Sequence, residues 1–138
     1  MTKISAKVIR KRPRYNEYQR RMTKFLKDNI NTSLNMVRNT VVTGISQGPA
    51  TGASRGDGSR ASKEGEYPMT DTGFLVQNIN ISVDNDGLGG SVGSNANYSE
   101  ALEFGTSKMG ARPFMQPSLE ENRPKIKRLF RTGNRGIT

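Results

Sequence analysis

The 138-residue chain contains neither cysteine nor histidine. Without cysteine it can form no disulfide and offers no thiol nucleophile, and without either residue it lacks the usual ligands of zinc. It also lacks the side chain best suited to proton transfer near neutral pH. We therefore expect a protein that is not an enzyme and that binds no metal or cofactor.

Long apolar runs are also missing. No segment reaches the roughly 18 consecutive apolar residues that a membrane-spanning helix needs. The beginning of the chain is too basic, and too often interrupted by polar side chains, for the apolar region of a signal peptide. The expected location is the cytoplasm of the cell that makes the protein, with neither a membrane nor a small-molecule substrate as a partner.

Large apolar side chains are scarce for a chain of this length. Leucine, isoleucine, valine and phenylalanine make up 27 residues, while 22 basic side chains face 12 acidic ones and give a net charge of +10. This combination is typical of chains near the border of disorder. The length suits one domain. We expect a single domain over residues 1–138 that either keeps long unstructured parts or completes its burial against partners.

The positive charge is concentrated at the two ends. Residues 1–27 hold ten basic and one acidic side chains, residues 28–107 hold four and nine, and residues 108–138 hold eight and two. Such asymmetry favours contact with polyanions or with acidic protein surfaces, and it lets copies of one chain associate head to tail. The basic residues predicted to make such contacts are Arg10, Lys11, Arg12, Arg14, Arg20, Arg21, Lys24 and Lys27.

The spacing of apolar residues changes within the N-terminal part of the chain. Apolar and polar residues alternate from Ile4 to Val8, which predicts a basic strand or arm in residues 1–12. Residues 13–44 carry apolar side chains three or four positions apart, which predicts one long helix that ends at Gly44. This helix would measure roughly 40–45 Å, more than a chain of this size needs to cover its own core. Its apolar face is expected to serve a core, and much of its length to project or to pack on a neighbour.

Residues 45–66 consist mostly of glycine, serine and charged residues, with Ile45 as the one large aliphatic side chain. Such a segment cannot form a core and predicts a long, flexible loop rich in glycine and serine. Compact domains seldom keep loops beyond about 12–15 residues without a functional reason. We expect this loop to become ordered on a partner.

Residues 67–131 begin with the pattern of a small sheet. The alternation over residues 74–83 predicts a strand, and Asp84-Asn85-Asp86-Gly87 is typical of a turn. Residues 88–92 can form the returning strand. Together with the N-terminal strand, these segments predict an antiparallel sheet with one buried face.

Two helices should follow the sheet. A short helix over residues 98–104 is expected to end at Gly105, and a last helix to begin near Pro117 and to run towards Arg131. Pro124 should kink or restart that helix, and residues 132–138 should form a tail. The predicted fold is α+β, a small antiparallel β-sheet packed by a long N-terminal helix and a kinked C-terminal helix.

Two patterns that suggest chemistry have simpler explanations. Glu100 and Glu103 lie one helical turn apart, but no further group supports an acid–base pair, and a solvated or subunit-facing helix edge is the better interpretation. The glycines between residues 44 and 58 are followed by no Gly-Lys-Ser/Thr and preceded by no strand, which excludes a nucleotide-binding P-loop.

Two stretches, residues 67–75 and 98–117, resemble the tail-component family of long-tailed bacteriophages, known as tail-completion, neck or head–tail joining proteins. The family's pattern is a Thr-Gly-x-Leu before a strand, then Tyr…Glu-Phe-Gly-Thr, a loop, and Arg-Pro-Phe-x-x-Pro opening the last helix. Where the family usually has a basic residue after the first motif, this chain has Val76-Gln77. The residues that carry the resemblance are Thr72, Gly73, Leu75, Tyr98, Glu103, Phe104, Gly105, Thr106, Arg112, Pro113, Phe114 and Pro117.

The resemblance implies a structural virion protein that forms a ring, a hexamer by the symmetry of such tails, in the neck where the head connector meets the tail tube. Its expected partners are further copies of itself, the adjoining connector, tail-tube or terminator proteins, and DNA passing through the lumen. A tail-terminator or head-closure ring is an alternative of the same architecture. A basic DNA-binding accessory protein is an alternative of another class, with binding independent of base sequence. A lumen that must release DNA should not hold it, so protein contact is favoured for most basic residues.

The motif residues also carry structural expectations. Tyr98 and Phe104 should anchor the short helix on the sheet, and Pro113 and Phe114 should fix the entry of the last helix. Arg112 is expected to meet Glu103 or the C-terminus of a helix, within one subunit or between two.

Overall fold

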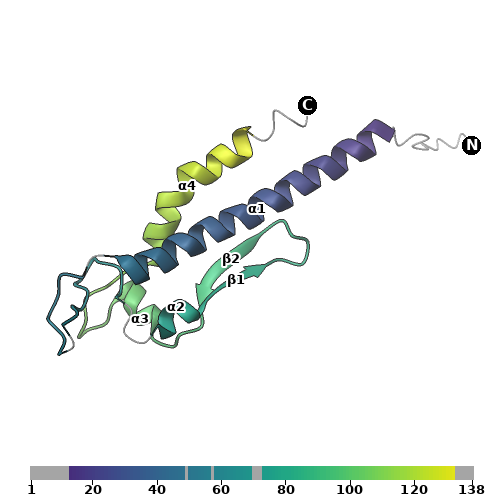
Figure 1. The fold of residues 1–138 in the computed structure, drawn as a ribbon. Coiled ribbons are helices and arrows are strands. Elements are labelled where there is room, and N and C mark those ends of the chain that lie inside the picture. The colour runs from purple at the N-terminus through teal and green to yellow at the C-terminus, as the bar shows by residue number, and fades with distance from the viewer. Residues whose placement is uncertain (1–12, 49, 57, 70–72, 133–138) are drawn as a thin grey trace, which may run out of the picture.

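The computed structural model describes residues 13–48, 50–56, 58–69 and 73–132 of the chain (Figure 1). The predicted N-terminal strand, with Arg10, Lys11 and Arg12, and the C-terminal tail from residue 133 lie outside the described residues. A long first helix, a two-stranded antiparallel sheet and a long last helix confirm the predicted α+β fold. The elements are, in order, α1 (Pro13–Gln47), α2 (Phe74–Gln77), β1 (Ile79–Val83), β2 (Gly90–Ser94), α3 (Ser99–Phe104) and α4 (Met115–Thr132).

Helix α1 is 35 residues long, about 52 Å at 1.5 Å per residue. It begins at Pro13, a residue that suits the first position of a helix because it has no N–H to leave unpaired. Near its other end Val37, Val41 and Ile45 are buried, four positions apart on one face. Ile45, predicted to belong to the flexible loop, is therefore part of the core.

The helix does not end at Gly44, as predicted, but continues to Gln47. A Cβ atom at Gly44 would lie 2.4 Å from the ring of Tyr67. That ring is held in place because the Tyr67 hydroxyl forms a 2.9 Å hydrogen bond with Ser118 Oγ on α4. Gly44 therefore permits close packing of the Tyr67 ring on the helix and does not terminate it.

Strands β1 and β2 form an antiparallel hairpin in which Ile79 pairs with Ser94, Ile81 with Val92 and Val83 with Gly90. The predicted turn is present, and the N–H of Asp84 donates to the carbonyl of Gly89 at 3.0 Å. Within the described part of the chain the sheet has these two strands. Leu88, predicted to lie in the returning strand, is exposed in the turn before it.

The strand predicted over residues 74–83 begins only at Ile79, because residues 74–77 form the helical turn α2. The Gln77 N–H donates to the Gly73 carbonyl at 3.0 Å, and the Asn78 side chain donates to the Phe74 carbonyl at 2.8 Å. Asn78 thus closes the turn before the strand begins. Gly73 has a φ of +78°, a conformation that glycine adopts without strain.

Helix α1 lies between α4 on one side and the hairpin on the other (Figure 1). Helix α4 runs antiparallel to it, because Asn122 Nδ2 donates to Thr40 Oγ1 at 2.8 Å while the rings of Phe25 and Phe130 meet at 6.3 Å. Helix α4 begins two residues before Pro117 and continues through Pro124 without a restart. The buried apolar residues of the core are Val37, Val41, Ile45, Leu75, Ile79, Ala96 and Phe114.

The glycine-rich loop after α1 has internal hydrogen bonds over its described residues. The Gly52 N–H donates to the Ala61 carbonyl at 2.8 Å, and the Arg55 N–H donates to the Ser59 carbonyl at 2.8 Å, so the loop doubles back as a narrow hairpin. The Gly65 N–H donates to the Ala111 carbonyl at 2.9 Å and joins the loop to the segment before α4. Its flexibility, and its ordering on a partner, stay predictions.

No helix in the described ranges combines the length and the apolar character needed to cross a membrane.

Candidate functional site

Residues 98–117, which carry most of the resemblance, fold into one corner that joins α3 to α4. Helix α3 ends at Gly105, as predicted, with the Gly105 N–H donating to the Ala101 carbonyl at 2.8 Å. Gly105 has a φ of +75°, and a Cβ there would approach the Ala111 nitrogen to 2.9 Å. The chain then returns along α3, where the Arg112 N–H donates to the Leu102 carbonyl at 2.6 Å. Only glycine allows both this conformation and this close return.

Glu103 caps the N-terminus of α4. Its carboxylate accepts the N–H groups of Phe114 at 2.8 Å, Met115 at 3.0 Å and Gln116 at 3.0 Å. The first N–H groups of a helix have no partner within the helix, and a negative charge there also interacts favourably with the helix dipole. Glu103 therefore fixes α4 on α3. Glu100, one turn away, is exposed and takes no part in this cap.

Within one chain Arg112 bonds to neither Glu103 nor the end of a helix, so that part of the prediction is wrong, while a contact between subunits stays a prediction. Its Nε and Nη2 atoms donate to the Ser62 carbonyl at 3.2 and 3.1 Å, and its Nη1 donates to the Gly110 carbonyl at 3.5 Å. The carboxylate of Glu103 is already used by three backbone N–H groups, whereas the loop presents a carbonyl that the guanidinium can hold with two donors. Arg112 thus anchors the glycine-rich loop.

The two aromatic residues at the ends of α3, Tyr98 just before it and Phe104 at its last position, do not behave as predicted. Phe104 is 78% exposed and cannot anchor the helix on the sheet. Leu102 packs against the core instead, and a residue two positions further along a helix faces almost the opposite direction. Tyr98 is also exposed, with its ring 6.0 Å from that of Phe74. Phe114, by contrast, is fully buried and fixes the entry of α4, as predicted.

The remaining residues that carry the resemblance, where the structure describes them, lie in the core, at the start of α4 or in the turn after α3. Leu75 is buried in the core, and Pro113 and Pro117 are half-buried on either side of the start of α4. The Thr106 hydroxyl accepts the Lys108 N–H at 3.3 Å within the turn after α3. Thr72 lies outside the described residues.

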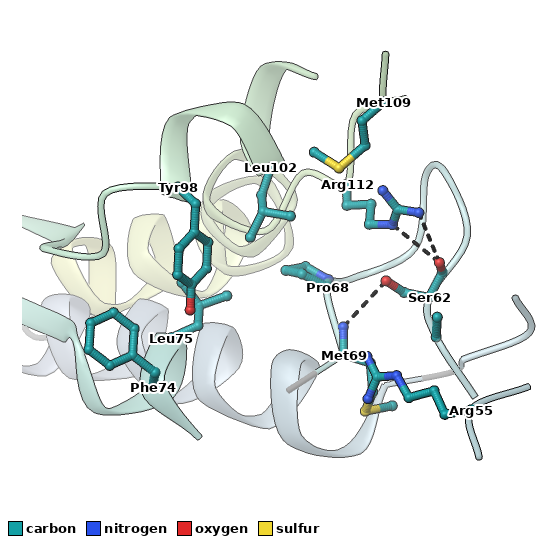
Figure 2. A pocket seen from close by; sticks show the side chains of 11 residues that line it. Arg55, Ser62, Pro68, Met69, Phe74, Leu75, Tyr98, Leu102, Met109 and Arg112 are labelled. Carbon is teal, nitrogen blue, oxygen red and sulfur yellow. Dashed lines mark hydrogen bonds between the residues drawn. The ribbon is translucent and has the colours of Figure 1, made fainter. Parts of the chain in front are cut away.

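A cavity of about 470 Å³ lies between the glycine-rich loop, α2 and α3. Figure 2 shows the rings of Phe74 and Tyr98 on one side and the guanidinium groups of Arg55 and Arg112 on the other. Arg112 is held by Ser62, whose hydroxyl also accepts the Met69 N–H at 3.4 Å. Of the described residues that line it, none is acidic, and they form neither a nucleophilic pair nor a group of metal ligands.

A second hollow, which we call the apolar groove, has a volume of about 750 Å³ and lies between α1, β2, α3 and α4. Val37 and Phe114 are buried at its base, and Phe104 and Leu119 are exposed at its rim. The charged residues in its lining are both acidic, Glu100 and Glu103. A hollow of this kind can receive apolar side chains that carry positive charge beside them. Its members are Leu34, Val37, Gly90, Ser91, Val92, Ser99, Glu100, Glu103, Phe104, Phe114, Met115, Gln116 and Leu119.

Residues 13–24, which we call the projecting segment, form the N-terminal part of α1. Figure 1 shows α1 running past the end of α4 and past the tip of the hairpin. The contact of Phe25 with Phe130 marks the last turn that α4 reaches. Beyond it α1 continues for about 18 Å, with Tyr15 56% and Tyr18 42% exposed.

The predicted basic contact residues divide into two groups where the structure describes them. Arg21 pairs with Glu17 at 2.6 Å, and Lys24 pairs with Asp28 at 2.6 Å, both on the surface of their own helix. The other three are exposed, and of these Lys27 has its methylene groups beside Gly87 at the hairpin tip. These three residues are Arg14, Arg20 and Lys27.

Sequence reasoning missed the cap, the loop anchor and the apolar groove. The cap joins residues more than ten positions apart, and Arg112 reaches a carbonyl fifty positions away. No local pattern predicts either contact, because in the sequence a carboxylate or guanidinium on a short helix or loop cannot be distinguished from an ordinary exposed charge.

Comparisons with models of known protein families, with curated proteins and with solved structures returned no match for this chain. In the part of the chain that the structure describes, no three histidine, cysteine, aspartate or glutamate residues gather as metal ligands would.

Proposed function

We propose that this protein is a structural subunit of a tailed-phage virion, assembling as a ring, a hexamer, in the neck that joins the head connector to the tail tube. The observation that carries the proposal is the projecting segment. About a third of α1 extends beyond every described element that packs on it, with tyrosines exposed on its apolar face. A protein that acts alone has little use for such an extension, whereas a subunit can cover it with a neighbour.

The resemblance in residues 67–75 and 98–117 supports the same proposal of a structural virion subunit. Its most specific residues form a corner in which Gly105 turns the chain, Glu103 caps α4 and Arg112 holds the loop. These contacts stabilise the relative positions of the loop, α3 and α4. A subunit that must present surfaces to neighbours at set angles benefits from such a rigid corner.

Two other assignments compete with this one. A tail-terminator or head-closure ring would use the same architecture with different neighbours. A DNA-binding accessory protein is favoured by the exposed Arg14 and Arg20, which lack ion pairs among the described residues. Against DNA, Arg21 and Lys24 are partly neutralised by acidic residues on their own helix.

Sedimentation velocity of the purified full-length chain, with and without duplex DNA at several salt concentrations, tests the proposal. We expect a discrete ring whose size does not depend on DNA. A monomer that binds DNA, with an affinity that falls steeply as salt rises, would instead support the accessory protein. Antibody labelling of purified virions should then place the protein at the neck and not along the tail tube.

A further inference from the structure

The proposed ring requires two different complementary surfaces on each subunit, because a ring is built from head-to-tail contacts. We propose that the projecting segment of one copy of this chain lies in the apolar groove of the next copy. The inference rests on the proposed function, and it goes further by naming both faces of the contact.

The apolar side chains of the two surfaces match in kind and spacing. Tyr15, Tyr18 and Met22 lie at positions i, i+3 and i+7, which places them along one face of the projecting segment. Helices that bind grooves use this spacing for their anchor residues. On the other side, Phe104 and Leu119 line the groove and are 78% and 39% exposed, so they offer apolar area that a partner can cover. Tyrosines suit such a contact because their rings are apolar and their hydroxyl groups tolerate water before assembly.

The charges of the two surfaces are opposite. The projecting segment carries four basic side chains and one acidic, and Arg14, next to Tyr15, has no ion pair among the described residues. Among the described residues, the charged side chains that line the groove are Glu100 and Glu103, both acidic. Opposite charges around an apolar contact guide the approach of the partners and fix the direction of docking.

The two surfaces cannot meet within one chain. Tyr18 on the projecting segment and Leu34 in the groove belong to the same continuous helix, α1. Sixteen helical positions hold them about 24 Å apart. The segment can therefore enter only the groove of another copy, and each copy then offers one free segment and one free groove. Repetition of this contact closes a ring if the rotation between neighbours allows it, and otherwise extends a filament.

Cysteine cross-linking tests the contact on the full-length chain, which has no cysteine of its own. One set of proteins carries Tyr15→Cys or Tyr18→Cys, and a second set carries Phe104→Cys or Leu119→Cys. All four sites are exposed, so folding should be preserved. When members of the two sets are mixed and oxidised, or treated with a short bis-maleimide, we expect cross-linked dimers from at least one of the four pairs. Arg20→Cys, on the opposite face of the segment, serves as the matched control and should cross-link at least tenfold less.

The possible results distinguish a failure of the proposed contact from a failure of the proposed function. A ring in which none of the four pairs cross-links, or in which Arg20→Cys reacts equally well, overturns the contact and leaves the ring. Cross-links between two segments, with none to the groove, also overturn it, because they indicate a symmetric dimer. A protein that stays monomeric at all concentrations contradicts both proposals. Phe104→Asp provides a second measurement, since it should abolish assembly, whereas Leu88→Asp at the hairpin tip should assemble normally.

Discussion

The two ends of α1 have the same helical spacing of apolar residues but opposite surroundings. Towards the C-terminus Val37, Val41 and Ile45 are covered by the hairpin, α2 and α4. Towards the N-terminus Tyr15 and Tyr18 are exposed, and nothing in the described chain covers them. Periodicity identifies which face of a helix is apolar, but it does not say whether the same chain or another one covers that face.

The types of side chain differ in a way that fits the two surroundings. The buried end uses valine and isoleucine, which have no polar atom and belong inside a protein. The projecting end uses tyrosine, methionine and arginine, the residue types enriched at the centre of protein–protein interfaces. Composition along one helix thus separates a surface made for the subunit's own core from a surface suited to a neighbour.

The largest effect is expected when one apolar side chain is truncated at each end of the helix. Ile45→Ala should lower the free energy of unfolding by about 2–5 kcal/mol, because it leaves a cavity in the core. Tyr18→Ala should change it by no more than about 0.5 kcal/mol while the subunits are dissociated. Urea denaturation at low protein concentration measures both. Equal losses at the two ends would show that the projecting segment is packed in the monomer.

A second test concerns the close packing of Tyr67 against the buried end. Gly44→Ala should raise helix propensity by about 1 kcal/mol. The added methyl would also displace the Tyr67 ring, and overpacking costs about 1–3 kcal/mol. We expect net destabilisation in thermal and urea unfolding. Gly93→Ala in β2 is the control, because a Cβ there meets no atom within 4 Å. A Gly44→Ala variant more stable than the parent would contradict the close packing of the Tyr67 ring on this glycine, because the gain in helix propensity would then exceed any cost of overpacking.

The third test loosens the helix that covers the buried end of α1. Glu103→Ala removes a carboxylate that accepts three N–H groups of α4, and loss of a cap costs about 0.5–2 kcal/mol. Hydrogen exchange should show faster opening of the first turn of α4. Glu100→Ala, three residues away and exposed, should leave both stability and exchange unchanged in the monomer. Equal effects of the two substitutions would contradict the capping role.

The smallest effect is expected in the loop beside the buried end. The Thr51 hydroxyl, together with the N–H groups of Lys63 and Thr51, lowers the pKa of the Glu66 carboxyl below its ordinary value of 4.5. The charged form is favoured in the folded state, so the contact is fully present above about pH 4.5 and is lost as the pH falls through the lowered pKa. Limited proteolysis between residues 51 and 66 should therefore accelerate on acidification. Glu66→Gln should remove this dependence, and an unchanged pH profile in the variant would exclude Glu66 as its source.

Much of the fold was predictable, because it depends on local patterns. The long helix, the β-hairpin turn, the short helix ending at Gly105 and the last helix each follow from spacing or turn residues within a few positions. The errors were also local in origin. Residues 74–77 alternate as a strand would, but Asn78 closes them into a helical turn. Pro124 lies inside α4 and no restart of that helix follows it, while the predicted kink stays a prediction.

The candidate surfaces were less predictable than the fold. The length of α1 predicted a projecting part, and the structure identifies residues 13–24 as that part. The groove had no signal in the sequence, because its lining comes from four elements spread over residues 34–119. Phe104 was expected inside and lies outside, because Leu102 on the same short helix takes the buried direction.

The periods, the turns and the excess of positive charge at the beginning of the chain follow from the order of residues, because they depend on neighbouring positions alone. Contacts between distant segments place Gly44 inside a helix, make Glu103 the cap of α4, and bury one end of α1 while the other extends past the described elements. Those outcomes depend on which distant segment reaches each residue. The Tyr67 ring packs on Gly44, Glu103 accepts three N–H groups of α4, and the end of α4 reaches Phe25 on α1. Each of these contacts joins residues that lie more than one helical turn apart in the sequence.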